Sequence, residues 1–332
     1  MSPTSDMRFE SVSIEENDDS PVESKDNRGI RRCDVSRQFS FIDDAFVGER
    51  VTVEEAFERV GGFGRFQLMS CTMNTLANMG AVFFLLSFAF LEKNPTFKCQ
   101  MTPNSDVWTV GTDEQTLQEE FCFSNYHCEI DWQDPQSLHN LIEQFDVFCE
   151  PKWKIGMLGF SFLIGIVVGC LTVARLGDVY GRKPIYKLGL WMHLAFSVLL
   201  CMLQTKNFFV IYGLLVIFGM SVTARYYVGY SFNIEMQPKS HQPLVSTIQF
   251  LSESVVYCII CLYFMYVSKN WIFLQVPNIT LTITGLMFLY SMPETPRFLL
   301  SQNRYQAARA VFSRMAQYNG LPRERADSFV FV

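Results

Sequence analysis

Two ionisable side chains lie inside long apolar stretches of this sequence. Arg225 interrupts residues 207–234, and Glu253 interrupts residues 242–268. A charge at the centre of a membrane-spanning helix costs roughly 2.5–3.5 kcal/mol on insertion scales, so such residues usually serve a function. At a rise of about 1.5 Å per residue, counting from Asn207 places Arg225 close to the inner surface. Counting back from Glu235 instead places Arg225 near mid-membrane and at a depth similar to that of Glu253, if the two stretches are antiparallel helices. We therefore predict an Arg225–Glu253 ion pair, or a shared polar site that faces a central cavity.

Other polar and aromatic side chains accompany these charges. Glu253 also has two further interpretations, since it can attract a cation directly or be protonated and uninvolved. Gln249 precedes Glu253 by four residues, and Asn74 and Asn78 have the same spacing, so each pair shares one helix face. Lipid offers no hydrogen bonds, so these faces must turn to a cavity or to another helix. Aromatic rings such as that of Tyr257 can hold a cation, or can pack against lipid or helices.

Six apolar stretches carry these side chains, and each is long enough to cross a bilayer. A helix needs about 20 apolar residues to cross a hydrocarbon core of roughly 30 Å. Of the 332 residues, 49% are hydrophobic and only 18% are charged, whereas about a quarter are charged in soluble domains. The sequence therefore predicts an all-α membrane protein with a six-transmembrane-helix bundle. The stretches cover residues 66–91, 155–174, 188–205, 207–234, 242–268 and 271–292.

The segments outside the apolar stretches divide by charge. Residues 1–65 and 92–152 carry 27 acidic and 12 basic side chains, whereas residues 153–332 carry 15 basic and 6 acidic ones. Lys and Arg gather in the cytosolic loops of membrane proteins. The basic loops after the second and sixth stretches are therefore predicted to be cytosolic, as are both chain ends, with the 92–152 loop extracellular. The net charge of −6 argues against nucleic-acid binding.

This division predicts four regions. Residues 1–50, rich in Ser, Asp, Glu and Asn, are expected to form a disordered cytosolic tail. Residues 51–65 contain capping-box spacing from Thr52 to Glu55 and predict an amphipathic helix. The six-helix bundle with its extracellular loop then covers residues 66–292. Residues 293–332 are expected to begin a central cytosolic helical segment.

Cysteine positions agree with an extracellular loop. Four of the ten cysteines lie within residues 92–152, an even number in an oxidising environment. Two disulfide bonds are therefore predicted, and three pairings are possible. The disulfide candidates are Cys99, Cys122, Cys128 and Cys149.

A short loop between the second and third stretches combines charge with glycine. Its central residues are Asp178, Gly181, Arg182 and Lys183. Such a loop can hold a neighbouring helix end through charge and helix-dipole contacts, or it can serve only to keep this side of the protein cytosolic. It resembles the cytoplasmic signature loop of the major facilitator superfamily. It departs from that family where Ala174 replaces a glycine and Val179 replaces a basic residue.

Further segments narrow the resemblance. Glu294 and Arg297 belong to a Pro-Glu-Thr-Pro-Arg motif directly after the sixth stretch, and residues 145–149 with Trp153 close the acidic loop. Together with residues 62–67 and the cysteine-bearing loop, these segments look like the organic cation/anion transporter family of that superfamily. The resemblance covers about residues 45–320 and implies secondary-active or facilitative transport of small organic ions, organic cation-like, by alternating access.

The resemblance also implies twelve spans in two halves with the substrate between them, so this sequence corresponds to the N-terminal half. The expected partners are the lipid bilayer, a small organic ion and a second six-helix half. The expected location is the plasma membrane, with an internal membrane as the alternative. A substrate path is expected along Asn74, Asn78, Arg225, Gln249, Glu253 and Tyr257. Gating is expected at Asp178, Gly181, Arg182 and Lys183, with Glu294 and Arg297 in a second cytosolic motif.

Enzyme and cofactor chemistry are not indicated. The sequence has no Walker loop and no paired catalytic carboxylates, and its four histidines form no metal-binding pair. We therefore expect neither an enzyme nor a cofactor or metal site. The alternative to a transporter is a truncated, non-transporting membrane protein that acts as an interaction or assembly subunit.

Overall fold

The computed structural model describes residues 49–100, 108–109, 122 and 127–331. The tail expected over residues 1–50 lies outside the described residues, except for its last two. Glu49 and Arg50 belong to strand β1 (Glu49–Val51) instead.

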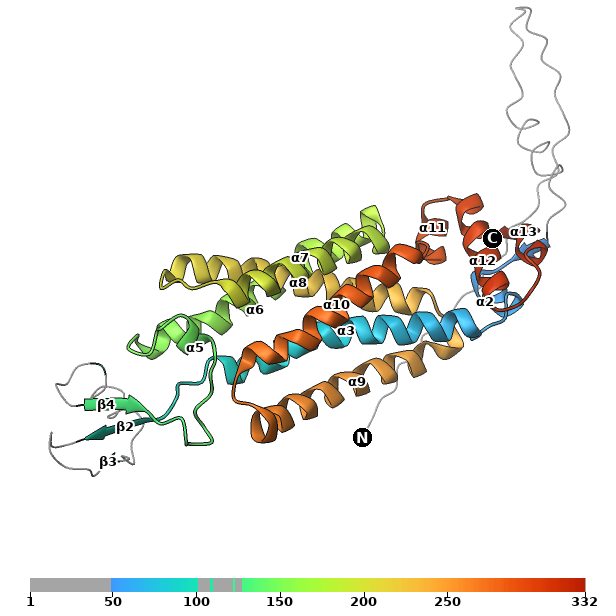
Figure 1. The fold of residues 1–332 in the computed structure, drawn as a ribbon. Helices are drawn as coiled ribbons and strands as arrows, with labels where there is room; N and C mark the ends of the chain where they lie inside the picture. Colours follow the sequence, from blue (N-terminus) through green and yellow to red (C-terminus); the bar gives the residue numbers. More distant parts are fainter. Residues whose placement is uncertain (1–48, 101–107, 110–121, 123–126, 332) are drawn as a thin grey trace, which may run out of the picture. The chain divides into compact units, whose positions relative to one another are not determined.

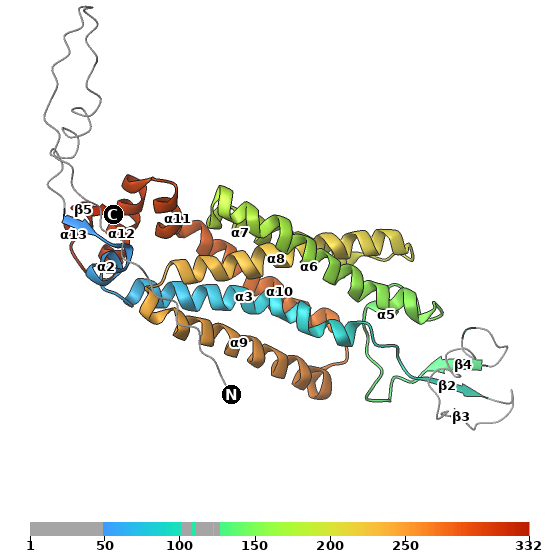
Figure 2. The ribbon, with the colours of Figure 1, turned by 180° about the vertical axis from the view of Figure 1, so that it is seen from behind.

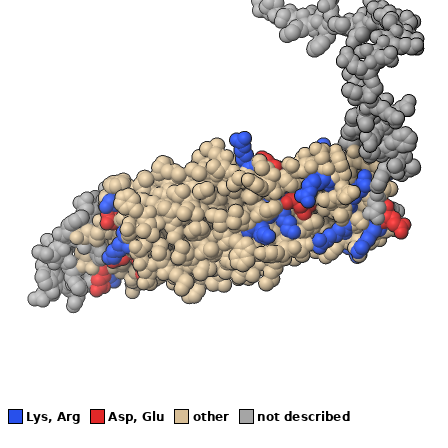
Figure 3. All heavy atoms as spheres, turned by 90° about the horizontal axis from the view of Figure 1, so that it is seen from above, with Lys and Arg blue, Asp and Glu red and all other residues tan. Residues whose placement is uncertain are grey.

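Among the described residues, six helices are long and apolar enough to cross a membrane, which confirms the predicted all-α, six-span fold. Figure 1 shows their arrangement, and Figure 3 shows a band of the viewed face without charged side chains between the charged groups at its two ends. The third helix begins earlier than predicted, at Arg182, and the fifth continues as a π-helical turn, Tyr263–Val267. The six are α3 (Arg65–Leu91), α6 (Lys152–Tyr180), α7 (Arg182–Met202), α8 (Phe208–Glu235), α9 (Gln242–Leu262) and α10 (Trp271–Ser291).

Glycines allow α6 and α8 to cross at close range. A Cβ atom at Gly165 would lie 3.0 Å from the Cα of Gly219, and one at Gly169 would lie 2.6 Å from the hydroxyl of Thr223. The small-residue spacing of Gly165 and Gly169 therefore serves helix packing. Phe84 of α3 joins this contact, with ring centroids 4.5 Å from Phe218 of α8.

Short elements close the end of the bundle at which α10 terminates; we call it the basic end. Before the bundle, α2 (Val53–Arg59) begins after Thr52, whose hydroxyl accepts a hydrogen bond of 3.3 Å from the Glu55 N–H. After α10, helix α12 (Tyr305–Tyr318) packs its apolar side on α2. There the rings of Phe57 and Phe312 meet edge-on, with their centroids 5.1 Å apart. Figure 2 shows these elements together. They are α11 (Pro296–Ser301), α12 (Tyr305–Tyr318), α13 (Glu324–Asp327) and β5 (Phe329–Phe331), which pairs in parallel with β1.

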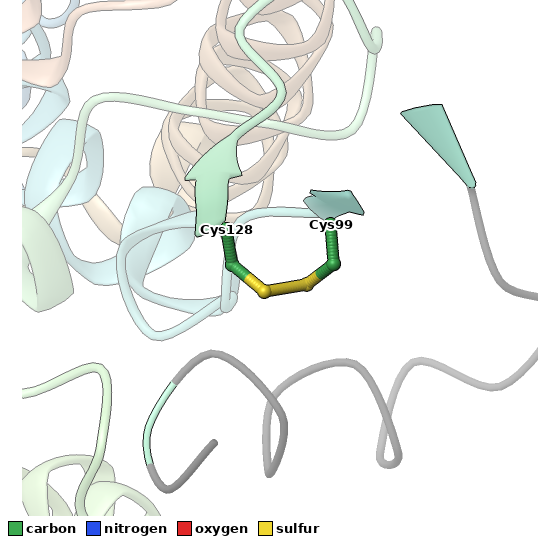
Figure 4. The surroundings of a disulfide bond; sticks show 2 residues. All are labelled: Cys99 and Cys128. Carbon is green, nitrogen blue, oxygen red and sulfur yellow. A yellow bond between two sulfur atoms is a disulfide. The ribbon is translucent and has the colours of Figure 1, made fainter. Parts of the chain in front are cut away.

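The opposite end carries the described parts of the 92–152 loop; we call it the loop end. Strands β3 (Trp108–Thr109), β2 (Phe97–Gln100) and β4 (His127–Ile130) form an antiparallel sheet in that order, and helix α5 (Leu141–Gln144) follows. Cys99 and Cys128 face each other across β2 and β4 and form a disulfide bond (Figure 4). A second disulfide joins Cys122 to Cys149. The structure thus has one of the three possible pairings.

A buried carboxyl follows α3 at the loop end. The carboxylate oxygens of Glu92 occupy space left free by Gly159 of α6, since a Cβ atom there would lie 2.7 and 3.0 Å from them. Among the described residues, Glu92 Oε1 has no hydrogen-bond partner. Burial raises the pKa of Glu92 to about 7, and a backbone hydrogen bond with Gly159 partly offsets this rise.

Glu92 should make thermal stability depend on pH. Between pH 4.5, the ordinary pKa, and about 7, the folded chain binds a proton that the unfolded chain has released, so this contribution to stability is lost as the pH rises. In Glu92→Gln that loss is absent. The difference in Tm between Glu92→Gln and wild type should therefore increase from pH 5 to 8, as measured by thermal unfolding in one detergent. A difference that does not change with pH would contradict this assignment.

Candidate functional site

Arg225 lies inside the bundle with no exposed surface. Its Nη1 donates a hydrogen bond of 2.8 Å to the hydroxyl of Thr282 on α10, and its Nη2 donates to the carbonyl of Ala77 on α3. Gly80 makes room for the guanidinium, because a Cβ atom at this position would collide with Nη2. One side chain of α8 therefore joins α3 and α10.

A chain of buried polar groups extends from Arg225. The hydroxyl of Thr282 donates to the carbonyl of Asn278 at 2.7 Å. The side chain of Asn278 lies 3.1 Å from His193 Nε2 on α7, and donates to Ser197 at 3.3 Å and to Gln275 at 3.0 Å. The network thus bonds α3, α7, α8 and α10 together. We call it the buried hub; its side chains are Arg225, Thr282, Asn278, His193, Ser197 and Gln275.

The predicted Arg225–Glu253 ion pair is wrong. Among the described residues, no carboxylate lies within ion-pair distance of Arg225; Glu253 Oε1 instead accepts a hydrogen bond of 2.6 Å from the hydroxyl of Tyr226. Successive residues leave a helix about 100° apart, so Arg225 points toward α3 and α10 while Tyr226 points toward α9. Counting residues estimated the depth of both charges but not the direction in which each side chain leaves its helix.

The carboxylate of Glu253, on α9, lies beside tyrosines of α8 and of its own helix. The rings of Tyr226 and Tyr227 meet edge-on with their centroids 5.2 Å apart, and the Tyr226 hydroxyl donates its hydrogen bond to Glu253. Tyr227 is 46% exposed and Tyr257 is 48% exposed. Glu253 and Tyr257 line an open hollow of about 560 Å³ together with Phe250. We call Glu253, Tyr226, Tyr227 and Tyr257 the acid–aromatic site. A carboxylate beside aromatic faces is suited to an organic cation.

The other residues expected along a substrate path are buried within this bundle. Asn74, Asn78 and Gln249 have at most 1% exposed surface. Asn74 donates to the carbonyl of Ser70 at 3.0 Å, whereas the side chains of Asn78 and Gln249 have no hydrogen-bond partner among the described residues. Of the six expected path residues, only Glu253 and Tyr257 are accessible in this structure.

The loop between α6 and α7 forms part of a charge network at the basic end. Arg182 forms an ion pair with Asp178, one turn earlier, and its Nε donates to Glu235 Oε1 at the end of α8 at 2.9 Å. The second oxygen of Glu235 accepts a hydrogen bond of 2.6 Å from the hydroxyl of Thr295, before α11. Three helix ends and the segment after α10 are therefore linked through two side chains, Arg182 and Glu235.

Glu294 connects to the same loop through the start of α7. Its two carboxylate oxygens accept the backbone N–H of Lys183 at 3.0 and 3.3 Å, where the helix dipole favours a negative charge. Lys183 Nζ donates in turn to the carbonyl of Met292. Burial raises the pKa of Glu294, and the backbone N–H groups of Lys183 and Thr295 oppose the rise.

Gly181 allows this approach. Its φ of 108° lies in the region that favours glycine, and a Cβ atom there would be 2.6 Å from Glu294 Oε2. Of the expected gating residues, Lys183 therefore bonds Glu294 beside a backbone position that favours glycine, whereas Asp178 and Arg182 bond each other and Glu235.

Arg297 extends the network to α2. Its Nη2 donates to Glu54 Oε1 at 2.7 Å, and its guanidinium lies 5.7 Å from the centre of the Phe57 ring. The other oxygen of Glu54 accepts the backbone N–H of Lys239, just before α9, at 2.9 Å. Of the two residues of the motif after α10, Glu294 therefore binds the start of α7 and Arg297 binds the start of α2.

Sequence reasoning missed most of the buried hub and also Glu54. The available signal was the spacing of Gln275, Asn278 and Thr282, which recur every three to four residues in an otherwise apolar stretch and so share one helix face. Polar side chains on one face of a membrane helix indicate a partner helix. Glu54 had no comparable signal, because its partner Arg297 is distant in sequence.

In comparisons with known proteins, the chain matches a transporter family and individual transporters. A family model described as sugar (and other) transporter matches residues 68–328. The human organic cation/carnitine transporter 2 is 26% identical over 226 residues, which are 67% of this chain and 38% of that protein.

Two other relatives match a longer part of the chain. Rat organic anion transporter 3 is 24% identical over 302 residues, 82% of this chain and 54% of its own length. An organic cation transporter-like protein of Drosophila melanogaster is 24% identical over 297 residues, 80% of this chain and 51% of its own. The matched part of the chain therefore spans between 38% and 54% of the length of these relatives.

The buried hub predicts that Gly80 tolerates no side chain. Gly80→Ala should displace the guanidinium of Arg225 from Ala77 and destabilise the bundle by about 1–3 kcal/mol, as overpacking usually does. Gly213→Ala in α8 is the matched control, because a Cβ atom there meets nothing within 4 Å. The Tm of Gly80→Ala should fall while that of Gly213→Ala stays level or rises. Equal Tm values for both variants would count against the hub.

The charge network predicts that Glu294 secures the start of α7. Glu294→Ala leaves the Lys183 N–H without its acceptor, which should lower the free energy of unfolding by about 1–3 kcal/mol. The Tm should therefore fall, and trypsin should cleave the loop between α6 and α7 faster. Glu324→Ala at the exposed start of α13 is the control and should leave both readings unchanged. If trypsin cleaves wild type and Glu294→Ala at the same rate, Glu294 does not secure this loop.

Proposed function

The chain belongs to the sugar (and other) transporter family of the major facilitator superfamily, and from this membership and the acid–aromatic site we propose that it carries small organic cations across a membrane. The match also confirms the resemblance to organic cation/anion transporters, which the named relatives represent. The relatives named above are transporters, which is consistent with the expectation that this protein is not an enzyme.

The observation that carries the proposal is the accessible carboxylate of Glu253. It lies beside Tyr226 and Tyr257, and Glu253 and Tyr257 line one open hollow. An organic cation placed there gains a charge-assisted contact with the carboxylate and cation–π contacts with the rings. Arg225, the basic residue within α8, points toward α3 and α10, so it forms no ion pair with Glu253.

Transport would proceed by alternating access. In this proposal the face of α8 and α9 that bears Glu253 turns toward a second six-helix half, and the cation is held between the two halves near the midplane. The buried hub keeps this bundle a single body. The network around Arg182, Glu235 and Glu294 latches helix ends on the cytosolic side, and its release accompanies the change of access. Both chain ends are cytosolic and the bundle lies in the plasma membrane.

Binding of tetraethylammonium tests the proposal without requiring transport. The purified chain should bind the radiolabelled cation in a saturable way. Glu253→Gln should bind about 10–100-fold more weakly, because a contact between a cation and a carboxylate contributes about 1.5–3 kcal/mol. Glu92→Gln removes a buried carboxyl elsewhere and should bind like wild type.

Two outcomes would contradict the proposal. Preference for an organic anion, such as p-aminohippurate, over tetraethylammonium would exclude a cation site at Glu253. Absence of binding to the chain, alone or together with a second half, would favour the alternative of an interaction or assembly subunit.

A further inference from the structure

A groove on α12 at the basic end is lined by arginines that the proposed transport mechanism does not use. It has a volume of about 600 Å³, and Arg309, Arg314 and Arg323 contribute to its walls. Gln306, Ser313 and Gln317 supply the remaining polar groups of the lining. Among the described residues, no acidic side chain lines it. Its charge therefore suits a ligand with more than one negative group.

The groove lies directly below the end of a membrane-spanning helix. Arg314 Nη2 donates a hydrogen bond of 2.6 Å to the carbonyl of Ser291, the last residue of α10. On the next turn, the hydroxyl of Tyr318 lies 3.0 Å from the sulfur of Met69, in the second turn of α3. Two spans thus hold α12 at the level where lipid headgroups meet the helix ends.

The side chains of α12 separate into an apolar face and a polar face. The apolar side of the helix is buried in a hydrophobic core that also contains Phe57 of α2; its residues there include Ala308, Val311, Phe312 and Met315. Gln306, Arg309, Ser313 and Gln317 recur at helical spacing on the opposite side, and Arg323 reaches across to bond Gln317. Folding buries the apolar face of α12, and the basic groups line the groove on the opposite face.

We propose that this groove binds a membrane phospholipid whose headgroup carries several phosphates, such as a phosphoinositide of the adjacent leaflet. Guanidinium groups bind phosphate oxygens in pairs, and three of them exceed what a headgroup with a single net charge requires. The volume is within the usual range for a small-ligand site. The assignment of the leaflet rests on the proposed cytosolic orientation of the basic end; binding itself does not depend on transport.

The test is the binding of fluorescent, short-chain phosphatidylinositol 4,5-bisphosphate to the purified full chain, followed by anisotropy. The double variant Arg309→Gln/Arg323→Gln should bind about 30-fold more weakly, because each basic group near an anionic lipid contributes about fivefold. Arg304→Gln is the matched control, because Arg304 is exposed on the same segment but lines a neighbouring hollow that shares only Gln306 with the groove. Its loss should change binding by less than about twofold.

Further arms distinguish the source of the phosphates and guard against misfolding. Arg309→Lys/Arg323→Lys keeps both charges and should retain most of the affinity, so a failure of the Gln variant to fold leaves the proposal testable. Equal affinity for soluble inositol 1,4,5-trisphosphate would overturn a lipid site. Equal affinity for phosphatidylserine would overturn the requirement for several phosphates. An equal loss in Arg304→Gln would overturn the groove as the location.

Discussion

A guanidinium buried in a membrane bundle must find hydrogen-bond acceptors within the protein, because lipid offers none. Arg225 finds them on α3 and α10, and Asn278 carries the network on to α7. Satisfying this one group therefore fixes the mutual position of four helices. It also explains local features that otherwise look unrelated, namely a glycine at position 80 and polar residues along one face of α10. The bundle is held by a polar hub as well as by its phenylalanine core.

Helix α8 connects the three features that matter for function. Arg225 belongs to the buried hub, Tyr226 bonds Glu253 of the acid–aromatic site, and Glu235 joins the charge network at the basic end. A displacement of α8 would strain all three, whereas a movement of the entire bundle would leave the contacts within it intact. This favours motion of the bundle as one body, the form of motion that alternating access requires.

The predictable features were those set by local sequence. Six spans, an even number of loop cysteines and the glycine-charge motif all depend on composition or on short spacing, and the structure contains each of them. The direction of Arg225 was not predictable, because the angle at which a side chain leaves a helix has no meaning until the neighbouring helices are placed. For the same reason the spacing indicated that Asn78 shares a helix face with Asn74, and Gln249 with Glu253, but it did not indicate that Asn78 and Gln249 are buried. Pairs such as Glu54 and Arg297 depend on contacts across the whole chain.

The polar residues of the spans divide between the buried hub and the accessible acid–aromatic site. A membrane-impermeant, hydrophilic thiol reagent tests this separation directly in membranes, using Tyr257→Cys and Asn278→Cys in a background with Cys258 and Cys261 replaced by serine. Cysteine at position 257 should react, and tetraethylammonium should protect it, while cysteine at position 278 should stay unlabelled. Labelling at position 278 with none at position 257 would contradict the account.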